Sequence, residues 1–275
     1  WNKHNDPVRN VHFLVRVFDG KVLQTSGNTA YVSDAATGRL IWKRSIDESR
    51  AIGWSVVGDG KVFVIASDGD LLKNRASHAT PADRIVALDA ATGERLWQYT
   101  GLSGHATFRI VYHRDSLVVP AFAVNELKAN FGKDPVVVRL KASDGSVVWR
   151  STPKGGTRGH YPIVLATGDE IIVGQQGGFG VDFKTGEMTR SYSWGQLDAS
   201  CADLKAVPGY TLYGLAFVND EGERITRGQT RTICGVGLFP AYGMLYGSPL
   251  GVLFSEYLNV YLALSREPLP VPMDD

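Results

Sequence analysis

A short turn sequence recurs along this chain and constrains its fold more than any other feature. Asp-Ala-Ala-Thr-Gly occupies residues 34–38 and again residues 89–93, and in both copies a tryptophan follows four positions after the glycine. Each copy has an apolar run before it and a second apolar segment after it. Aspartate offers a side-chain acceptor at the start of a turn, and glycine tolerates positive φ at its end. Each copy therefore predicts a strand, a tight turn and a return strand.

Two further copies of the turn are less regular. In the third, Lys141 stands in place of the aspartate, but Gly145 still precedes Trp149 by four positions. The fourth keeps Gly186 and has Arg190 where the other copies have tryptophan. A period of about 40 to 50 residues with several short strands favours a propeller over a helical solenoid. The residues that we expect to build the repeat are Asp34, Gly38, Trp42, Asp89, Gly93, Trp97, Gly145, Trp149 and Gly186.

A second pattern, an apolar hairpin, lies ahead of each turn. Asp-Gly at two of the hairpin turns is a strong signal for a two-residue hairpin loop. A hairpin and the turn unit that follows it make one four-stranded antiparallel blade. The hairpins occupy residues 14–23, 56–64, 110–119, 164–173, 204–213 and 236–246.

These patterns predict an all-β protein, a β-propeller of four-stranded antiparallel blades. We expect about six blades, with seven as the alternative, in one domain of residues 1–266 followed by a proline-punctuated tail of residues 267–275. The sixth blade has a third strand within residues 257–265 and no clear fourth one, so the residues before Val11 are a candidate for the missing outer strand.

Two insertions between the second and third strands of a blade are polar loops. They span residues 68–83 and 125–134 and are expected to project from one rim of the propeller. Such loops commonly contact partner proteins. They could equally be solvent-exposed loops that have no binding role.

The overall composition narrows the function classes. Charge is nearly balanced, with 29 Lys and Arg against 28 Asp and Glu, which argues against a nucleic-acid partner. No apolar run is long enough to span a membrane as a helix. The first residues are not a signal peptide and the chain does not begin with Met, so we expect a mature or trimmed product. Two cysteines are too few for a scaffold built on disulfides.

The repeat, read from Ala87 to Trp97 and in its copies, resembles that of the PQQ-like (quinoprotein dehydrogenase-like) β-propellers through about residue 190. The resemblance implies that Trp42, Trp97 and Trp149 pack between neighbouring blades. The family includes PQQ-dependent alcohol dehydrogenases and also noncatalytic scaffolds, such as the outer-membrane β-barrel assembly lipoprotein. The resemblance therefore indicates a fold more firmly than a function.

The dehydrogenases of that family are much longer and use a vicinal cysteine pair beside the quinone, together with a calcium-binding acidic set. In this chain Cys201 and Cys234 are not adjacent, and no acidic set matches. The resemblance thus argues against PQQ catalysis, and we expect no cofactor.

A candidate site follows from aligning the six hairpins. The hairpins are aligned on the apolar residue just after each turn, which is Val22, Val62, Leu117, Ile171, Leu212 or Leu245. Eleven positions before these residues stand Val11, Ala51, Ala106, His160, Cys201 and Cys234. This position begins the innermost strand, near the central channel, and His12 and His105 fall one residue from it. The cysteines could form a disulfide or bind a metal with His160. They could equally be small buried residues, with His160 in a turn.

No haem attachment sequence, nucleophile elbow, phosphate loop or His-Glu-x-x-His helix is present. The sequence therefore favours a secreted or periplasmic bacterial binding or scaffold module that engages a protein partner through its rim loops or inner face. The alternative is a cofactor- or metal-dependent redox enzyme domain that uses the Cys/His ring. A sugar-binding propeller would rest only on exposed aromatic side chains.

Overall fold

In a computed structural model, the described part of the chain is built from antiparallel strands and contains no helix. This confirms the expected all-β class. None of the described residues forms a helix that is long and apolar enough to cross a membrane. The described residues are 15–69, 80–107, 109–123, 135–154, 157, 163–174, 177–194, 204–207, 209–213, 216–219, 221, 223–226, 239–241, 244–247 and 262–265.

The strands form successive sheets in chain order. The first sheet holds β1 (Val15–Phe18), β2 (Lys21–Ser26), β3 (Thr29–Asp34) and β4 (Leu40–Ser45). The second holds β5 (Ala51–Gly58), β6 (Lys61–Ser67), β8 (Arg84–Asp89) and β9 (Arg95–Tyr99). The third holds β10 (His105–Thr107), β11 (Val111–His113), β12 (Ser116–Ala123), β13 (Val136–Lys141) and β14 (Val147–Ser151).

The later sheets are shorter. The fourth holds β15 (Ile163–Thr167), β16 (Glu170–Gly174), β17 (Gly177–Asp182) and β18 (Met188–Ser193). The fifth holds β19 (Lys205–Val207), β20 (Tyr210–Tyr213), β21 (Ala216–Asn219) and β22 (Arg224–Thr226). The sixth holds, within the described residues, β23 (Phe239–Ala241), β24 (Met244–Gly247) and β25 (Leu262–Ser265).

The hairpins predicted at the start of each sheet are present. Phe18 pairs with Lys21 and Gly58 with Lys61, so each Asp-Gly pair forms a two-residue loop. Both residues of each loop have positive φ, 42° and 68° in the first and 50° and 64° in the second. That backbone matches the right-handed twist of the flanking strands, which is why Asp-Gly predicts these hairpins.

One insertion differs from its prediction. Residues 68–83 were expected to form a polar loop, but they include the short strand β7 (Thr80–Pro81). β7 pairs with β10 of the following sheet, where Ala106 lies opposite Pro81. The insertion therefore joins the second sheet to the third by backbone hydrogen bonds.

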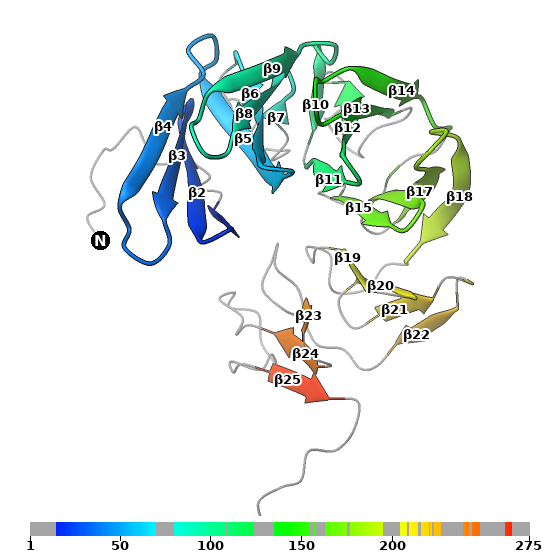
Figure 1. Ribbon diagram of the computed structural model, residues 1–275. Helices are drawn as coiled ribbons and strands as arrows, with labels where there is room; N and C mark the ends of the chain where they lie inside the picture. The colour runs from blue at the N-terminus through cyan, green and yellow to red at the C-terminus, as the bar shows by residue number, and fades with distance from the viewer. Residues whose placement is uncertain are drawn as a thin grey trace, which may run out of the picture.

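The sheets stand side by side around a common centre (Figure 1). β5, β11, β15, β19 and β23 lie on the inner side, and β4, β9, β14, β18 and β22 lie on the outer side. Inner strands of successive sheets touch: β5 contacts β1 and β11, and β15 contacts β11 and β19. This radial order places the sheets face to face, as the blades of a propeller are placed.

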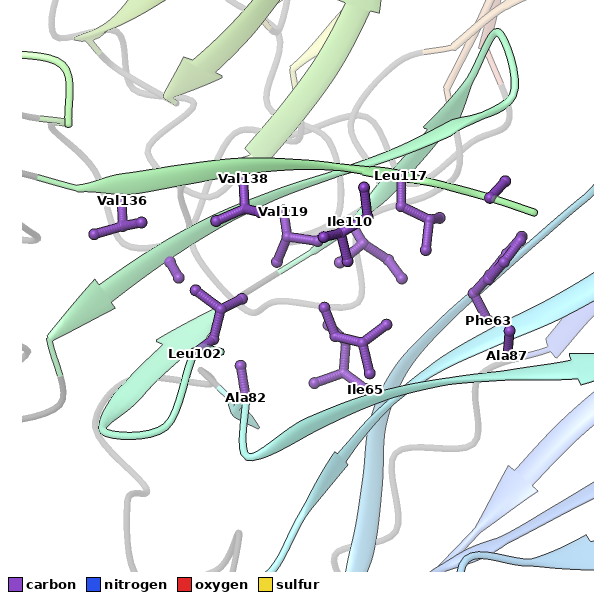
Figure 2. Packing of buried hydrophobic residues seen from close by; sticks show 14 residues of the cluster. Phe63, Ile65, Ala82, Ala87, Leu102, Ile110, Leu117, Val119, Val136 and Val138 are labelled. Carbon is purple, nitrogen blue, oxygen red and sulfur yellow. The ribbon is translucent and has the colours of Figure 1, made fainter. Parts of the chain in front are cut away.

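The core lies between the sheets, and β6 shows how a strand serves two interfaces. Phe63 and Ile65 pack toward the third sheet, whereas Val62 and Val64 pack toward the first, because successive side chains point to opposite faces. Figure 2 shows the cluster between the second and third sheets, with Phe63 and Ile65 on one side and Val119 on the other. The apolar runs of β6, β8 and β12 are thus buried on both faces.

Candidate functional site

The repeated turn is closed by its aspartate. Oδ1 of Asp34 accepts hydrogen bonds from the backbone N–H groups of Ala36 at 3.1 Å and Thr37 at 2.8 Å. Gly38 donates its N–H to the Asp34 carbonyl at 2.9 Å and has a φ of 72°. The hydrogen bonds, first of all from the Thr37 hydroxyl, hold the pKa of Asp34 below its usual range. In the third sheet Lys141 keeps the backbone bond, because Gly145 donates to its carbonyl at 2.9 Å.

The tryptophans join neighbouring sheets. Trp42 is only 7% exposed, and its Nε1–H donates to the carbonyl of Ala90 in the second sheet at 3.1 Å. Its ring lies against Gly93, where a Cβ would come within 2.7 Å of the indole. The same arrangement recurs in Trp97 with Ala142 and Gly145 and in Trp149 with Phe183 and Gly186, with a donor distance of 2.9 Å in both.

The junction between the fourth and fifth sheets departs from this pattern, because Arg190 takes the tryptophan's position. Its guanidinium turns toward Glu170 of its own sheet, with Nη2 2.8 Å from Oε2 and Nε 3.2 Å from Oε1. The Tyr192 hydroxyl donates to Oε2 at 2.6 Å, and the Thr189 hydroxyl donates to Oε1. Gly180 leaves room for this cluster, since a Cβ there would lie 2.1 Å from Oε1.

The cluster has a defined charge state. Burial by itself raises the pKa of Glu170, but the hydrogen bonds from Arg190, Thr189 and Tyr192 outweigh it and lower that pKa. Burial and the bond to Glu170 raise the pKa of Tyr192, and the bond to Glu170 raises the pKa of Arg190. At neutral pH the cluster therefore holds a carboxylate, a guanidinium cation and a neutral phenol.

Beside this cluster lies a cleft of about 920 Å³ between the fourth and fifth sheets. Its lining includes the hairpin turns at Gly168 and Gly209. Deeper in the junction, Tyr192 stacks on Trp194 with ring centroids 5.0 Å apart, and Trp194 donates to the Thr211 hydroxyl at 3.3 Å. The cleft is lined by Ala166, Thr167, Gly168, Asp169, Glu170, Ile172, Asp182, Thr189, Arg190, Tyr192, Ala206, Val207, Gly209, Tyr210, Thr211, Val218 and Asn219.

Comparison with known proteins places the repeat in a family. A family model described as outer membrane protein assembly factor BamB, of the PQQ-like repeat type, matches residues 4–121 and again residues 81–227. The chain belongs to this family. The crystal structure of BamB from Moraxella catarrhalis has a similar fold, with a TM-score of 0.56 at 16% identity over 86% of this chain and 69% of that one.

Dehydrogenases share the repeat as well. The quinohemoprotein alcohol dehydrogenase ADH-IIG of Pseudomonas putida is 28% identical over 54% of this chain and 20% of its own length. The glycerol dehydrogenase large subunit of Gluconobacter oxydans is 29% identical over 53% of this chain and 19% of its own. The aligned segment thus spans about a fifth of these curated relatives. The solved structure of ADHIIG, at a TM-score of 0.54 and 17% identity, shows the shared fold.

The channel residues predicted from the hairpin alignment fall mostly outside the described residues. His12, His160, Cys201 and Cys234 all lie there. His105 begins β10, where its Nδ1 lies 3.3 Å from the carbonyl oxygen of Ser103. The proposed ring of thiols and imidazoles therefore stays a prediction.

The family's dehydrogenases raise the question of a quinone and its calcium ion. In the part of the chain that the structure describes, no three His, Cys, Asp or Glu side chains come together as metal ligands. The described residues therefore do not fit a calcium-binding acidic set. Sequence reasoning also missed the cluster around Glu170, for which the signal was Arg190, the position where the repeat loses its tryptophan.

Proposed function

We propose that this chain is a noncatalytic binding or scaffold module that engages a protein partner at the rim of its sheets. The observation that carries the proposal is the cleft between the fourth and fifth sheets, whose volume of about 920 Å³ is typical of a binding site. The three carboxylates of its lining already have partners, because Glu170 pairs with Arg190, Asp169 pairs with Arg114 and Lys184, and Asp182 accepts N–H groups of its own turn. Recognition suits such a lining better than covalent or acid–base chemistry.

The same proposal includes the architecture and the location of the protein. Residues 1–266 form one propeller domain of about six blades, with seven as the alternative, and residues 267–275 are a tail. The matched family is described as an outer membrane assembly factor, which supports a periplasmic or secreted module of a bacterial assembly. We propose that it acts without PQQ.

Two rim surfaces are candidates for the partner. The cleft is lined by the turns between β15 and β16 and between β19 and β20. The insertions at residues 68–83 and 125–134 follow β6 and β12 in the chain, and their residues 70–79 and 125–134 lie outside the described residues. Exposed hairpin turns and insertions are common places for contacts, because the sheets hold them rigidly.

Site-specific photo-crosslinking in a native extract tests the proposal. A photoreactive residue is placed at Tyr210, at the cleft, or at Gly69, in the first insertion, with Leu40 on the outer strand of the first sheet as the control. We expect one defined protein adduct from Tyr210 or Gly69 and none from Leu40. Purified protein that stays monomeric and gives no adduct from either rim position contradicts the proposal.

A redox enzyme domain is the second candidate, favoured by the 28–29% identity to quinoprotein dehydrogenases. It would use His160, Cys201 and Cys234 at the channel, with His12 and His105 beside them. A visible absorption spectrum and metal analysis of the purified protein separate the two candidates. Intact mass under reducing and nonreducing conditions reports whether the cysteines form a disulfide.

A further inference from the structure

We propose that the cleft between the fourth and fifth sheets receives an aromatic side chain, a tryptophan indole in the first place, from a segment of the partner protein. This inference rests on the proposed function, since it requires a protein partner. The incoming indole would take the place that the chain's own tryptophan takes at the three preceding junctions.

The three preceding junctions show what the space between two sheets accommodates. In each, an indole lies over the turn glycine of the next sheet and donates its N–H to a backbone carbonyl of that sheet. At the fourth junction the corresponding side chain is Arg190, which turns back to Glu170 across its own sheet. The space that the indole fills elsewhere is therefore part of the open cleft.

The groups around the cleft favour an aromatic occupant over a small ion. Glu170 is paired with Arg190, and Asp169 is paired with Arg114 and Lys184 outside the cleft. The Asp182 carboxylate accepts two backbone N–H groups of its own turn. These charges already have partners, so an additional free ion would gain little at the cleft.

The remaining lining combines apolar and aromatic side chains with three threonines and Asn219. Ile172 and Val218 line the cleft between the sheets, and Tyr192 and Tyr210 add aromatic faces and edges. Tyr210 is 38% exposed, so its ring is accessible from solvent. An indole gains from apolar burial and from offset or edge contacts with such rings, and its N–H requires an acceptor. At the three preceding junctions a backbone carbonyl of the next sheet supplies that acceptor.

The dimensions favour a protein segment as the source of the indole. At about 920 Å³ the cleft is larger than one side chain fills, and the hairpin turns at Gly168 and Gly209 are part of its lining. Tryptophan, with tyrosine and arginine, is enriched among the residues that contribute most to binding at protein interfaces. A short stretch of chain can lie across the mouth while its aromatic side chain enters.

The probe is a synthetic peptide with the sequence of residues 93–99, Gly-Glu-Arg-Leu-Trp-Gln-Tyr, which in the second sheet presents an indole to its neighbour. Binding to the full chain is followed by NMR shifts of the backbone amides. The matched peptide has alanine in place of tryptophan, and N-acetyl-tryptophanamide is the small-molecule comparison. We expect saturable shifts at residues lining the cleft, and roughly thirtyfold weaker binding for the alanine peptide.

Two blocking variants keep the test falsifiable. Arg190→Trp restores the repeat's own indole, and Ala206→Trp fills the cleft from the fifth sheet. Both are expected to abolish the shifts, whereas Arg39→Trp, the same exchange at an exposed turn position of the first sheet, leaves them unchanged.

The outcomes separate this inference from the proposed function. Equal binding of both peptides, or shifts that persist in both folded blocking variants, overturns the indole site. Binding of N-acetyl-tryptophanamide as tight as that of the peptide assigns the cleft to a small aromatic molecule and also overturns it. If the peptide fails while the photo-crosslink from Gly69 persists, the module still binds a partner, and only the indole site is wrong.

Discussion

Replacing Gly93 by alanine tests how the repeated tryptophan joins two sheets. Gly93 has a φ of 74°, and a Cβ there would lie 2.7 Å from ring carbons of Trp42. The left-handed backbone costs an alanine about 1–2 kcal/mol, and forcing an extra methyl group into a packed contact costs about 1–3 kcal/mol more. The expected loss in the free energy of unfolding is therefore about 2–5 kcal/mol.

Gly38 provides a matched control, because it isolates the backbone contribution. It occupies the same turn position with a φ of 72°, but a Cβ there would have nothing within 4 Å. Gly38→Ala should therefore lose only about 1–2 kcal/mol. The difference between the two variants measures the contact with the indole.

Urea unfolding of the two variants and the parent chain measures these losses, with the slope compared to confirm that the unfolding transition is unchanged. In a Trp42→Ala background the ring is gone, so Gly93→Ala and Gly38→Ala should become equally destabilising. Equal losses of unfolding free energy for the two variants in the parent background would refute the reasoning. They would mean that the Trp42 ring can move away from a Cβ at residue 93 without any loss of stability.

Two further predictions concern the other junctions. Trp97→Phe should destabilise by about 0.5–1.5 kcal/mol through the lost hydrogen bond to Ala142. Trp149→Phe should lower the free energy of unfolding by less in the same urea assay, because the Phe183 carbonyl keeps a hydrogen bond from Arg139. A larger loss for Trp149→Phe than for Trp97→Phe would contradict this. The lowered pKa of Glu170 adds stability that is present above its ordinary value of 4.5 and is lost as pH falls through the lowered value. Unfolding free energies of Glu170→Gln should therefore fall less steeply than those of the parent below about pH 4.5, and identical pH profiles would contradict the assignment.

Local chemistry explains which parts of the fold could be predicted from the sequence. The Asp-Gly hairpins and the turn at residues 89–93 are determined by φ preferences and by side-chain acceptors within a few positions. The burial of β6 on both faces follows from a continuous apolar run. β7 could not be predicted in this way, because two residues have no periodicity and Pro81 argues against a strand.

The cluster around Glu170 depends on pairing that no local pattern reveals. Glu170 and Arg190 lie on β16 and β18, with β17 between them, and they meet because Gly180 carries no side chain. From the sequence, Arg190 is recognisable only as the position where the fourth copy of the repeat lacks its tryptophan. Its partner became evident only when the register of three strands was known.

At the fourth junction two aromatic residues, Tyr192 and Trp194, occupy the space between the sheets that a single tryptophan occupies at the other junctions. Trp194, four positions after Arg190 on the same side of the strand, is fully buried and hydrogen-bonds to Thr211 of the fifth sheet. This contact joins the two sheets in the buried part of the junction. Residue 190 is therefore not needed to join them. Arg190 and Glu170 then satisfy each other's charge, and Tyr192, stacked on Trp194, becomes one wall of the cleft. A repeat that loses its tryptophan in this way gains an open cleft without losing the junction.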